Sequence, residues 1–275
     1  MRFLGKFFRH KTAVFCSFCL GLLLLCAIFA PYLAPYDPYE ADYEALSALP
    51  SLTHLMGTDD LGRDVLSRII YGSRISLLIA FSSVFLGGLL GVSLGLASGY
   101  FAGLMDALLM RFCDVLFAFP GILLAIAVVA ILGPGLSSVI IAVATFSVPA
   151  FARLVRAEVL SLKTKAYVEA AQSMGASDLR VILLHILPGV LPVTTVLFTM
   201  RLGLGILTAA SLSFLGLGPE PDVPEWGNIL GTSRNLMMAG AWHASVFPGL
   251  AIFFAVLSFN LLGDALKDLL DPKAS

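Results

Sequence analysis

Six long apolar segments are the feature that most constrains this chain. A helix needs about 20 apolar residues to cross the bilayer core, and each segment reaches that length. Hydrophobic residues make up 59% of the 275 positions and charged residues 13%, against about 25% in soluble domains. Too little chain remains for a large soluble domain. The sequence therefore predicts an all-α, polytopic membrane bundle with six transmembrane helices, at 12–34, 76–98, 107–132, 136–156, 189–211 and 242–263.

Basic residues predict which side of the membrane each loop faces. With the N-terminus inside, the inner loops hold most of the 17 Lys and Arg residues, and the outer loops hold most of the acids. The positive-inside rule then places both termini and the 157–188 loop in the cytoplasm. The formal net charge of −1 hides this asymmetry and argues against nucleic acid as a partner. The inner set is Arg2, Lys6, Arg9, Lys11, Arg111, Arg153, Arg156, Lys163, Lys165, Arg180, Lys267 and Lys273.

The start of the chain resembles a signal peptide, because basic residues precede its first apolar segment. The apolar run is too long for a signal peptide and lacks a small-residue cleavage site, so we interpret it as a retained span. The chain then divides into a cytoplasmic N-terminal segment (1–11), the first span (12–34), an outer loop (35–75), a five-span core (76–272) that contains the 157–188 loop, and a tail (273–275).

One face of the second span carries almost no side chains. Ser83, Gly87, Gly91, Gly95 and Gly99 recur every four residues and form what we call the glycine stripe. Stripes of small residues let a neighbouring helix approach closely. The glycine stripe predicts either a static helix contact or a surface that slides during gating.

Three prolines are expected to bend the spans that contain them. Pro120, Pro149 and Pro248 lie within the third, fourth and sixth spans. Proline removes a backbone donor and clashes with the preceding turn, and neighbouring helices can satisfy the freed carbonyl groups. Kinks of this kind fit a transport pathway.

Charged residues inside the spans are few. Arg111 and Asp114 are one turn apart at the start of the third span, so we expect them to pair with each other. Arg201 lies near the middle of the fifth span, where a lone guanidinium is costly unless it faces a partner or a water-filled cavity. We expect Arg201 either to line the pathway, where it would meet a substrate carboxylate, or to form a structural pair between helices.

The chain has no recognisable catalytic, metal-binding or nucleotide-binding motif. Cys16, Cys19, Cys26 and Cys113 lie in spans, and the Cys16-x-x-Cys19 pair has no His or second pair beside it. Gly5-Lys6 is the only Gly-Lys pair and belongs to no phosphate-binding loop. We therefore expect no enzyme activity, no catalytic residue, no metal and no cofactor. Any ATP hydrolysis would occur on other subunits.

A polar segment interrupts the apolar chain at 163–188. Its first part predicts a short helix with one apolar stripe, and Gly175 is placed to end that helix. Ser177 is then placed to cap a second helix, with Asp178 in its first turn. The apolar stripe falls at i, i+3, i+4 and i+7 and consists of Tyr167, Ala170, Ala171 and Met174.

The pattern Glu169-Ala170-Ala171, then Gly175, then Leu187-Pro188 resembles the loop by which permease subunits of ATP-binding-cassette importers dock onto their ATPases. One departure is visible, since His185 stands where the general pattern has an aliphatic residue, as we expect in the peptide and nickel branch. The resemblance implies that ATPase coupling rests on Tyr167, Glu169, Ala170, Ala171, Met174 and Gly175.

Two outer segments resemble the same branch. Residues 57–72 begin Gly-Thr-Asp-Asp-Leu-Gly-Arg-Asp and resemble the signature before the second span of dipeptide, oligopeptide and nickel permeases. Their acids could hold a divalent cation, but we expect them to cap and solvate an interfacial helix, with Thr58 at its N-cap. Residues 213–227, with Trp226, suit a partly re-entrant loop or a contact with an extracytoplasmic binding protein.

Over about 12–272 the chain thus resembles the C-type permease subunit of dipeptide, oligopeptide and nickel importers. The resemblance implies a bacterial inner-membrane subunit that forms a pathway for di- or oligopeptides. The implied partners are a second permease in a heterodimer, two cytoplasmic ATPases, an extracytoplasmic binding protein and the lipid bilayer. The alternatives are uptake of glutathione-like peptides, nickel or a nickel chelate by the same machinery. An ion-coupled secondary carrier would instead need mid-membrane acids and an inverted repeat, and neither is visible.

Overall fold

The computed structural model describes residues 7–8, 10–238 and 240–270, so sequence predictions that fall on 1–6, 9, 239 and 271–275 lie outside the described residues. Within the described ranges the chain is almost entirely helical, and no strand is present. The helices are α2 (Lys11–Ile28), α3 (Ala30–Leu33), α4 (Val65–Phe101), α5 (Gly103–Ala118), α6 (Gly121–Leu132), α7 (Leu136–Lys163), α8 (Ala166–Ser173), α9 (Asp178–Val181), the π-helical η1 (Ile182–Ile186), α10 (Leu187–Phe214), α11 (Trp226–Thr232), α12 (Arg234–Met238) and α13 (His243–Leu270).

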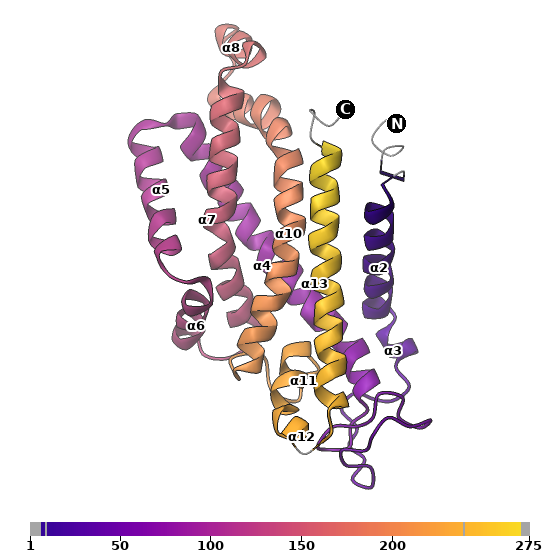
Figure 1. The fold of residues 1–275 in the computed structure, drawn as a ribbon. Coiled ribbons are helices and arrows are strands. Elements are labelled where there is room, and N and C mark those ends of the chain that lie inside the picture. Colours follow the sequence, from indigo (N-terminus) through magenta and orange to yellow (C-terminus); the bar gives the residue numbers. More distant parts are fainter. Residues whose placement is uncertain (1–6, 9, 239, 271–275) are drawn as a thin grey trace.

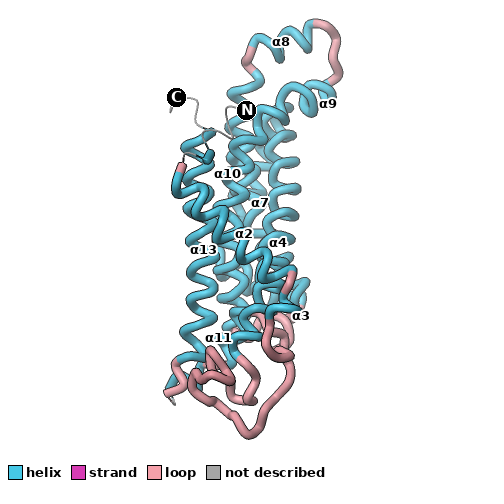
Figure 2. Tube along the Cα trace, turned by 90° about the vertical axis from the view of Figure 1, so that its right-hand side faces the viewer, coloured by secondary structure: helices cyan, strands magenta, loops and turns pink. Residues whose placement is uncertain are grey.

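The long helices run side by side between two ends of an elongated molecule (Figure 1). At one end, α8 projects beyond the long helices and is joined by a turn to α9 (Figure 2). At the other end lie α11, α12 and the segment between α3 and α4 (Figures 1 and 2). We call these the α8 end and the α11 end. The first turn of α2 and the last turn of α13 both lie at the α8 end (Figure 1).

Five described helices are long and apolar enough to cross a membrane: α2, α4, α7, the continuous run α9–η1–α10, and α13. The third expected span is not one continuous helix. It is divided into α5 and α6, which are bent by 95° to each other, and six spans result only if this pair counts as one. The break falls at Phe119 and Pro120, whose backbones are extended. Proline disfavours helical geometry in the residue before it, which explains the position of the break.

The other two prolines do not interrupt their helices. α7 continues through Pro149 and α13 through Pro248. α10 also contains an internal proline, Pro192, which the sequence reasoning did not single out. Pro149 and Pro248 are buried in the bundle, where neighbouring helices can satisfy the freed carbonyl groups, whereas Pro192 is exposed.

α4 begins at Val65, well before the apolar window at 76. Its N-cap is Asp64 and not Thr58, because the Asp64 carboxylate accepts from the Ser67 N–H at 2.8 Å. The Thr58 hydroxyl instead accepts from the Ala48 N–H at 2.8 Å and donates to the Ala45 carbonyl. Thr58 therefore folds the preceding loop, and the expectation that it caps this helix was wrong.

The glycine stripe of α4 lies against α7. A Cβ added at Gly91 would stand 2.5 Å from the Val148 carbonyl oxygen and 2.6 Å from the Phe151 Cβ. Gly87, Gly95 and Gly99 face other residues of α7 at comparable distances. Such distances are well inside van der Waals contact, so the two helix backbones are packed as closely as the absence of side chains permits.

Candidate functional site

The segment that follows α7 makes a sharp turn outside the bundle. Helix α8 ends in a Schellman motif, in which the Gly175 N–H donates to the Gln172 carbonyl at 2.9 Å and the Ala176 N–H to the Ala171 carbonyl at 3.1 Å. Gly175 has φ +83°, the left-handed conformation that favours glycine. We call residues 166–181, which form α8, this turn and α9, the α8–α9 elbow.

The apolar stripe expected on α8 is split between two faces. Ala171 is buried, but Tyr167 is 48% exposed and Met174 is 83% exposed. The buried face instead uses Val168, which packs in one cluster with Val159 of α7 and Val181 of α9. Tyr167, Met174, Glu169 and Ala170 are all exposed, so they form the free surface of the elbow at the α8 end. The sequence pattern missed Val168, although it stands three residues before Ala171 and so shares its face.

The second half of the elbow departs from expectation in one detail. Ser177 occupies the N-cap position of α9, but its side chain makes no capping hydrogen bond. Asp178 is in the first turn, as expected, and its carboxylate accepts from the Tyr100 hydroxyl at 2.7 Å. The half-buried His185 lies in the π-helical turn η1, and Leu187 and Pro188 begin α10 directly after it.

Arg201 lies in α10, about halfway along the helix. Its guanidinium carbon is 5.4 Å from the centroid of the Phe146 ring on α7, which is a cation–π contact. Its Nη1 atom is buried and has no hydrogen-bond partner among the described residues. No described carboxylate pairs with Arg201, so its contact between helices within this chain is the one with the Phe146 ring, and its place in the pathway stays a prediction. The guanidinium has unused hydrogen-bonding capacity.

Asp114 and Arg111 do not form the expected local pair. Asp114 binds Arg153 of α7, with Oδ1 2.6 Å from Nη2, and Arg153 also stands 4.3 Å from the Phe117 ring centroid. A second pair joins the same helices nearer the α8 end, where Asp106 accepts from Nε and Nη2 of Arg156 at 2.5 and 2.6 Å. These contacts tie α5 to α7, and no sequence spacing indicated either of them.

A cluster of charged residues lies at the α11 end. Asp59 is 2% exposed and accepts from Arg63 Nε at 2.7 Å, while Arg63 Nη1 is 3.1 Å from Asp222, which is 77% exposed on its side chain. Arg68 is fully buried, with Nη1 3.0 Å from the Pro38 carbonyl oxygen. Asp59 thus serves as a counter-ion to arginines. Among the described residues, no group of three or more His, Cys, Asp or Glu side chains is arranged for a metal ion.

The loop at 213–227 folds back onto the bundle, where α11 contacts α10, α13 and α4 (Figure 1). Glu225 is 1% exposed and accepts from Ser76 Oγ at 3.0 Å and from the Asn228 N–H at 3.0 Å. The Trp226 indole donates to the Ile69 carbonyl at 3.0 Å. These buried polar contacts anchor the loop to α4.

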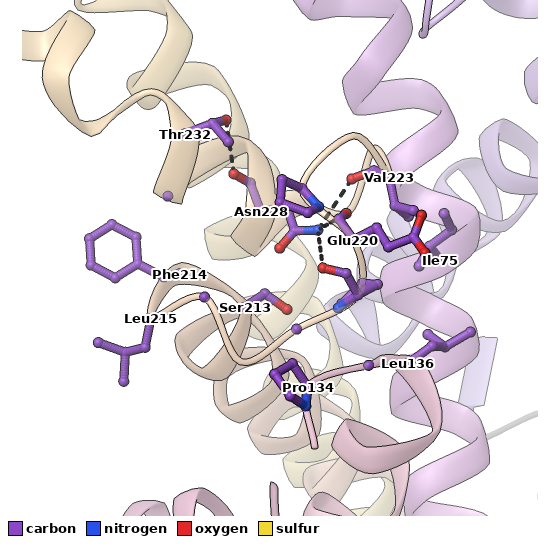
Figure 3. A pocket seen from close by; sticks show the side chains of 16 residues that line it. Ile75, Pro134, Leu136, Ser213, Phe214, Leu215, Glu220, Val223, Asn228 and Thr232 are labelled. Atoms are coloured by element: carbon purple, nitrogen blue, oxygen red, sulfur yellow. Dashed lines mark hydrogen bonds between the residues drawn. The ribbon is translucent and has the colours of Figure 1, made fainter. Parts of the chain in front are cut away.

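Next to this loop lies a cavity of about 780 Å³, lined by the connection between α6 and α7 and by residues of 213–232 (Figure 3). The Asn228 side chain donates to the carbonyl groups of Pro219 and Glu220 and shapes one wall (Figure 3). The cavity opens at the α11 end, on the side of the bundle opposite the elbow. Its lining is mainly apolar, with Glu220, Asn228 and Thr232 among its polar members.

The four cysteines are free thiols. Cys16, Cys19 and Cys26 of α2 line an apolar groove of about 420 Å³ that α4 and α13 complete, and Cys113 is buried in α5. Their surroundings are those of small apolar side chains.

The fold and the elbow together define a membrane permease: a bundle of spans with a helical elbow beyond one end and a folded-back loop at the other. Residues 91–275 match the family described as the binding-protein-dependent transport system inner membrane component, and residues 2–50 match the N-terminal transmembrane domain of oligopeptide transport permease C. This chain belongs to that family of inner membrane components, the permease subunits of ATP-binding-cassette importers, and within it to the peptide and nickel group.

Several glutathione transport system permease proteins named GsiD are similar to this chain along nearly its whole length. The protein from Pectobacterium atrosepticum is 53% identical over 272 residues, which cover 98% of this chain and 90% of that protein. The protein from Escherichia coli is 54% identical, with 98% and 89% covered. The expected family, multi-pass inner-membrane location and role as a transport subunit rather than an enzyme are confirmed by this membership.

Solved structures show the same fold at low sequence identity. An inward-facing MetNI methionine ABC transporter has a TM-score of 0.60 and 20% identity, covering 74% of this chain and 97% of its own. An amino acid ABC transporter has a TM-score of 0.54 and 16% identity, covering 73% and 92%. The all-α permease fold is therefore confirmed.

Proposed function

We propose that this chain forms part of the translocation pathway for short peptides, with glutathione as the first candidate substrate. The observation that carries the proposal is the 53–54% identity to glutathione permeases across 98% of the chain. Oligopeptides of other sequence belong to the same substrate class. Nickel or a nickel chelate is the second candidate, because the sequence motifs are shared with nickel permeases.

The proposed orientation places the α8 end in the cytoplasm. Lys11, Lys163, Arg180 and Lys267 lie in elements that begin or finish at that end, and Lys165 lies between α7 and α8, which agrees with the positive-inside rule. The exposed surface of the elbow would then face a cytoplasmic ATPase. The α11 end, with its 780 Å³ cavity, would face the extracytoplasmic binding protein.

The proposed complex contains a second permease subunit, two ATPases and the binding protein. No cofactor is bound by this chain, and ATP is hydrolysed by the ATPases. When ATP closes the ATPase pair, the elbow moves with it and the bundle opens outward; release of the hydrolysis products returns it to the inward-facing state. Reciprocal linkage requires the loaded binding protein and ATP to favour the same state.

Within this pathway we assign Arg201 the recognition of a substrate carboxylate. Its buried Nη1 lacks a partner among the described residues. A peptide supplies a C-terminal carboxylate, and an arginine fork binds such a group in bidentate geometry. The second permease would complete the wall that this chain leaves open.

The test is transport by the complete complex in reconstituted vesicles. Radiolabelled glutathione is expected to accumulate in an ATP-dependent manner, and excess unlabelled dipeptide shows whether the pathway accepts other short peptides. Nickel ions supplied as the chloride salt should neither accumulate nor compete. Accumulation of nickel without uptake of any peptide would overturn the proposal in favour of the second candidate.

A further inference from the structure

One side chain touches both arms of the α8–α9 elbow. Tyr100, which is 4% exposed, stands in the last turn of α4. Its hydroxyl donates to Asp178 Oδ1 at 2.7 Å and accepts from Gln172 Nε2 at 3.2 Å. Gln172 precedes the Gly175 turn and Asp178 follows it. The hydroxyl therefore bridges the two arms of the elbow on the side that faces the bundle.

One side of the turn is open. A Cβ added at Gly175 would meet nothing within 4 Å, while the two arms are joined by the backbone hydrogen bonds of the turn and by the cluster that contains Val168 and Val181. Opening at Gly175 would separate Gln172 from Asp178, and at least one of the Tyr100 hydrogen bonds would have to break. Because the bond to the Asp178 carboxylate is charge-assisted, it is the stronger of the two.

Tyr100 also binds α7. Its carbonyl oxygen accepts from Lys163 Nζ at 2.5 Å, and the same ammonium lies 5.2 Å from the centroid of the Tyr100 ring. Lys163 is the last residue of α7, immediately before the elbow. Tyr100 thus contacts the end of α7 and both arms of the elbow, while belonging to the helix that carries the glycine stripe.

We propose that Tyr100 is a positioning residue that passes movement of the elbow to the α4–α7 pair. The inference rests on the proposed function, in which an ATPase moves the elbow. With the two arms bridged, a displacement of α8 carries α4 with it. Without the bridge, only the cluster of Val168 and Val181 and the backbone of the turn join the two arms, so α8 hinges more freely at Gly175 and ATP would be hydrolysed with less transport.

The experiment measures glutathione transport and ATPase activity in the same vesicles containing the complete complex. Tyr100→Phe keeps the ring, the contact with Lys163 and the packing, and removes only the hydroxyl. Loss of a hydrogen bond to a charged group would shift the equilibrium between the bridged and the opened elbow by roughly tenfold. We expect transport per ATP to fall by about that factor while ATPase activity stimulated by loaded binding protein is kept.

Asp178 supplies a second variant pair, because its exposed position makes misfolding on substitution unimportant. Asp178→Ala should reproduce the effect of Tyr100→Phe. Asp178→Asn keeps an acceptor oxygen, so it should retain most of the coupling of ATP hydrolysis to transport. Combining Tyr100→Phe with Asp178→Ala should add little to either change alone. Tyr43→Phe, on an exposed outer side chain, is the matched control and should behave as wild type.

Unchanged transport per ATP in both Tyr100→Phe and Asp178→Ala would overturn the inference. Ala170→Arg, on the exposed face of α8, separates this result from failure of the proposed function. If Ala170→Arg releases the ATPases while the Tyr100 and Asp178 variants stay coupled, only the role of Tyr100 is wrong. If the ATPases remain bound and coupled in Ala170→Arg, the elbow is not the docking element, and both the docking role of the elbow and the role of Tyr100 are wrong.

Discussion

At the scale of single residues, Arg201 and Arg63 differ in whether their buried guanidinium groups have a partner. Arg201 has a buried Nη1 without a partner among the described residues, whereas Arg63 is 4% exposed and bound to Asp59. A buried charge is tolerated when it is paired or when it serves a ligand. Arg63 fits the first case, and we propose that Arg201 fits the second.

Arg201→Leu is expected to lower glutathione transport by roughly tenfold or more, because a charge-assisted hydrogen bond to the substrate is lost. Arg201→Lys keeps the charge but loses the bidentate geometry, so transport should fall less. Uptake by vesicles with matched amounts of assembled complex is the measurement. Equal transport by the Leu variant and the wild type would show that Arg201 does not read the substrate.

Asp59→Asn should destabilise the complex by roughly 3 kcal/mol, since the buried Arg63 and Arg68 lose their buried counter-ion. The thermal midpoint of the purified complex measures the effect. Asp60→Asn changes the adjacent exposed carboxylate and is the control. Similar midpoints for the two variants would mean that the exposed Asp222 alone suffices for the arginines.

At the scale of helices, the α4–α7 contact and the elbow depend on glycine for different reasons. In the glycine stripe, glycine is required because another backbone occupies the space of a side chain. At Gly175 the space is open, and glycine is required by the backbone conformation, with φ +83°. Substitutions at the two places should therefore have different consequences.

Gly91→Leu inserts a side chain where Val148 and Phe151 already stand, and overpacking of this kind costs about 1–3 kcal/mol. The expected result is a lower yield or a lower thermal midpoint of the complex. Gly21→Leu is the matched control, because a Cβ at Gly21 would meet nothing within 4 Å. A Gly91→Leu complex as stable as the control would contradict the close contact.

Gly175→Val places a β-branched residue in a left-handed conformation, which disfavours the Schellman turn and redirects α9. We expect membrane insertion to persist while ATPase association or the coupling of hydrolysis to uptake is weakened. ATPase activity stimulated by loaded binding protein, measured beside transport, checks this. Gly175→Asn should be milder because Asn tolerates positive φ, and wild-type behaviour of the Val variant would remove the elbow from the transmission path.

At the scale of the whole molecule, the decisive property is which end faces the cytoplasm. Met174 at the α8 end is 83% exposed and Leu52 at the α11 end is 98% exposed, so each offers an accessible labelling position. In a background without the native cysteines, Met174→Cys should react with a membrane-impermeant maleimide only after the membrane has been permeabilised. Leu52→Cys should react from outside in intact cells, and the reverse pattern would invert the proposed topology.

Features that depend on local chemistry could be predicted from the amino-acid sequence. The spans follow from apolar length, and the end of α8 follows from Gly175, because helix length and turn conformation are set by neighbouring residues. The glycine stripe could likewise be recognised from the sequence, since its four-residue spacing places every member on one helix face. The tertiary structure showed what that face meets, namely α7.

The partners of charged and polar groups could be identified only from the folded structure. Asp114 pairs with Arg153 rather than Arg111, Tyr100 reaches Asp178, and Val168 rather than Tyr167 turns inward. The 95° bend between α5 and α6 also exceeds what Pro120 alone indicated. These contacts join residues that are distant in the chain, and they exist because particular helices lie side by side, which no local spacing encodes.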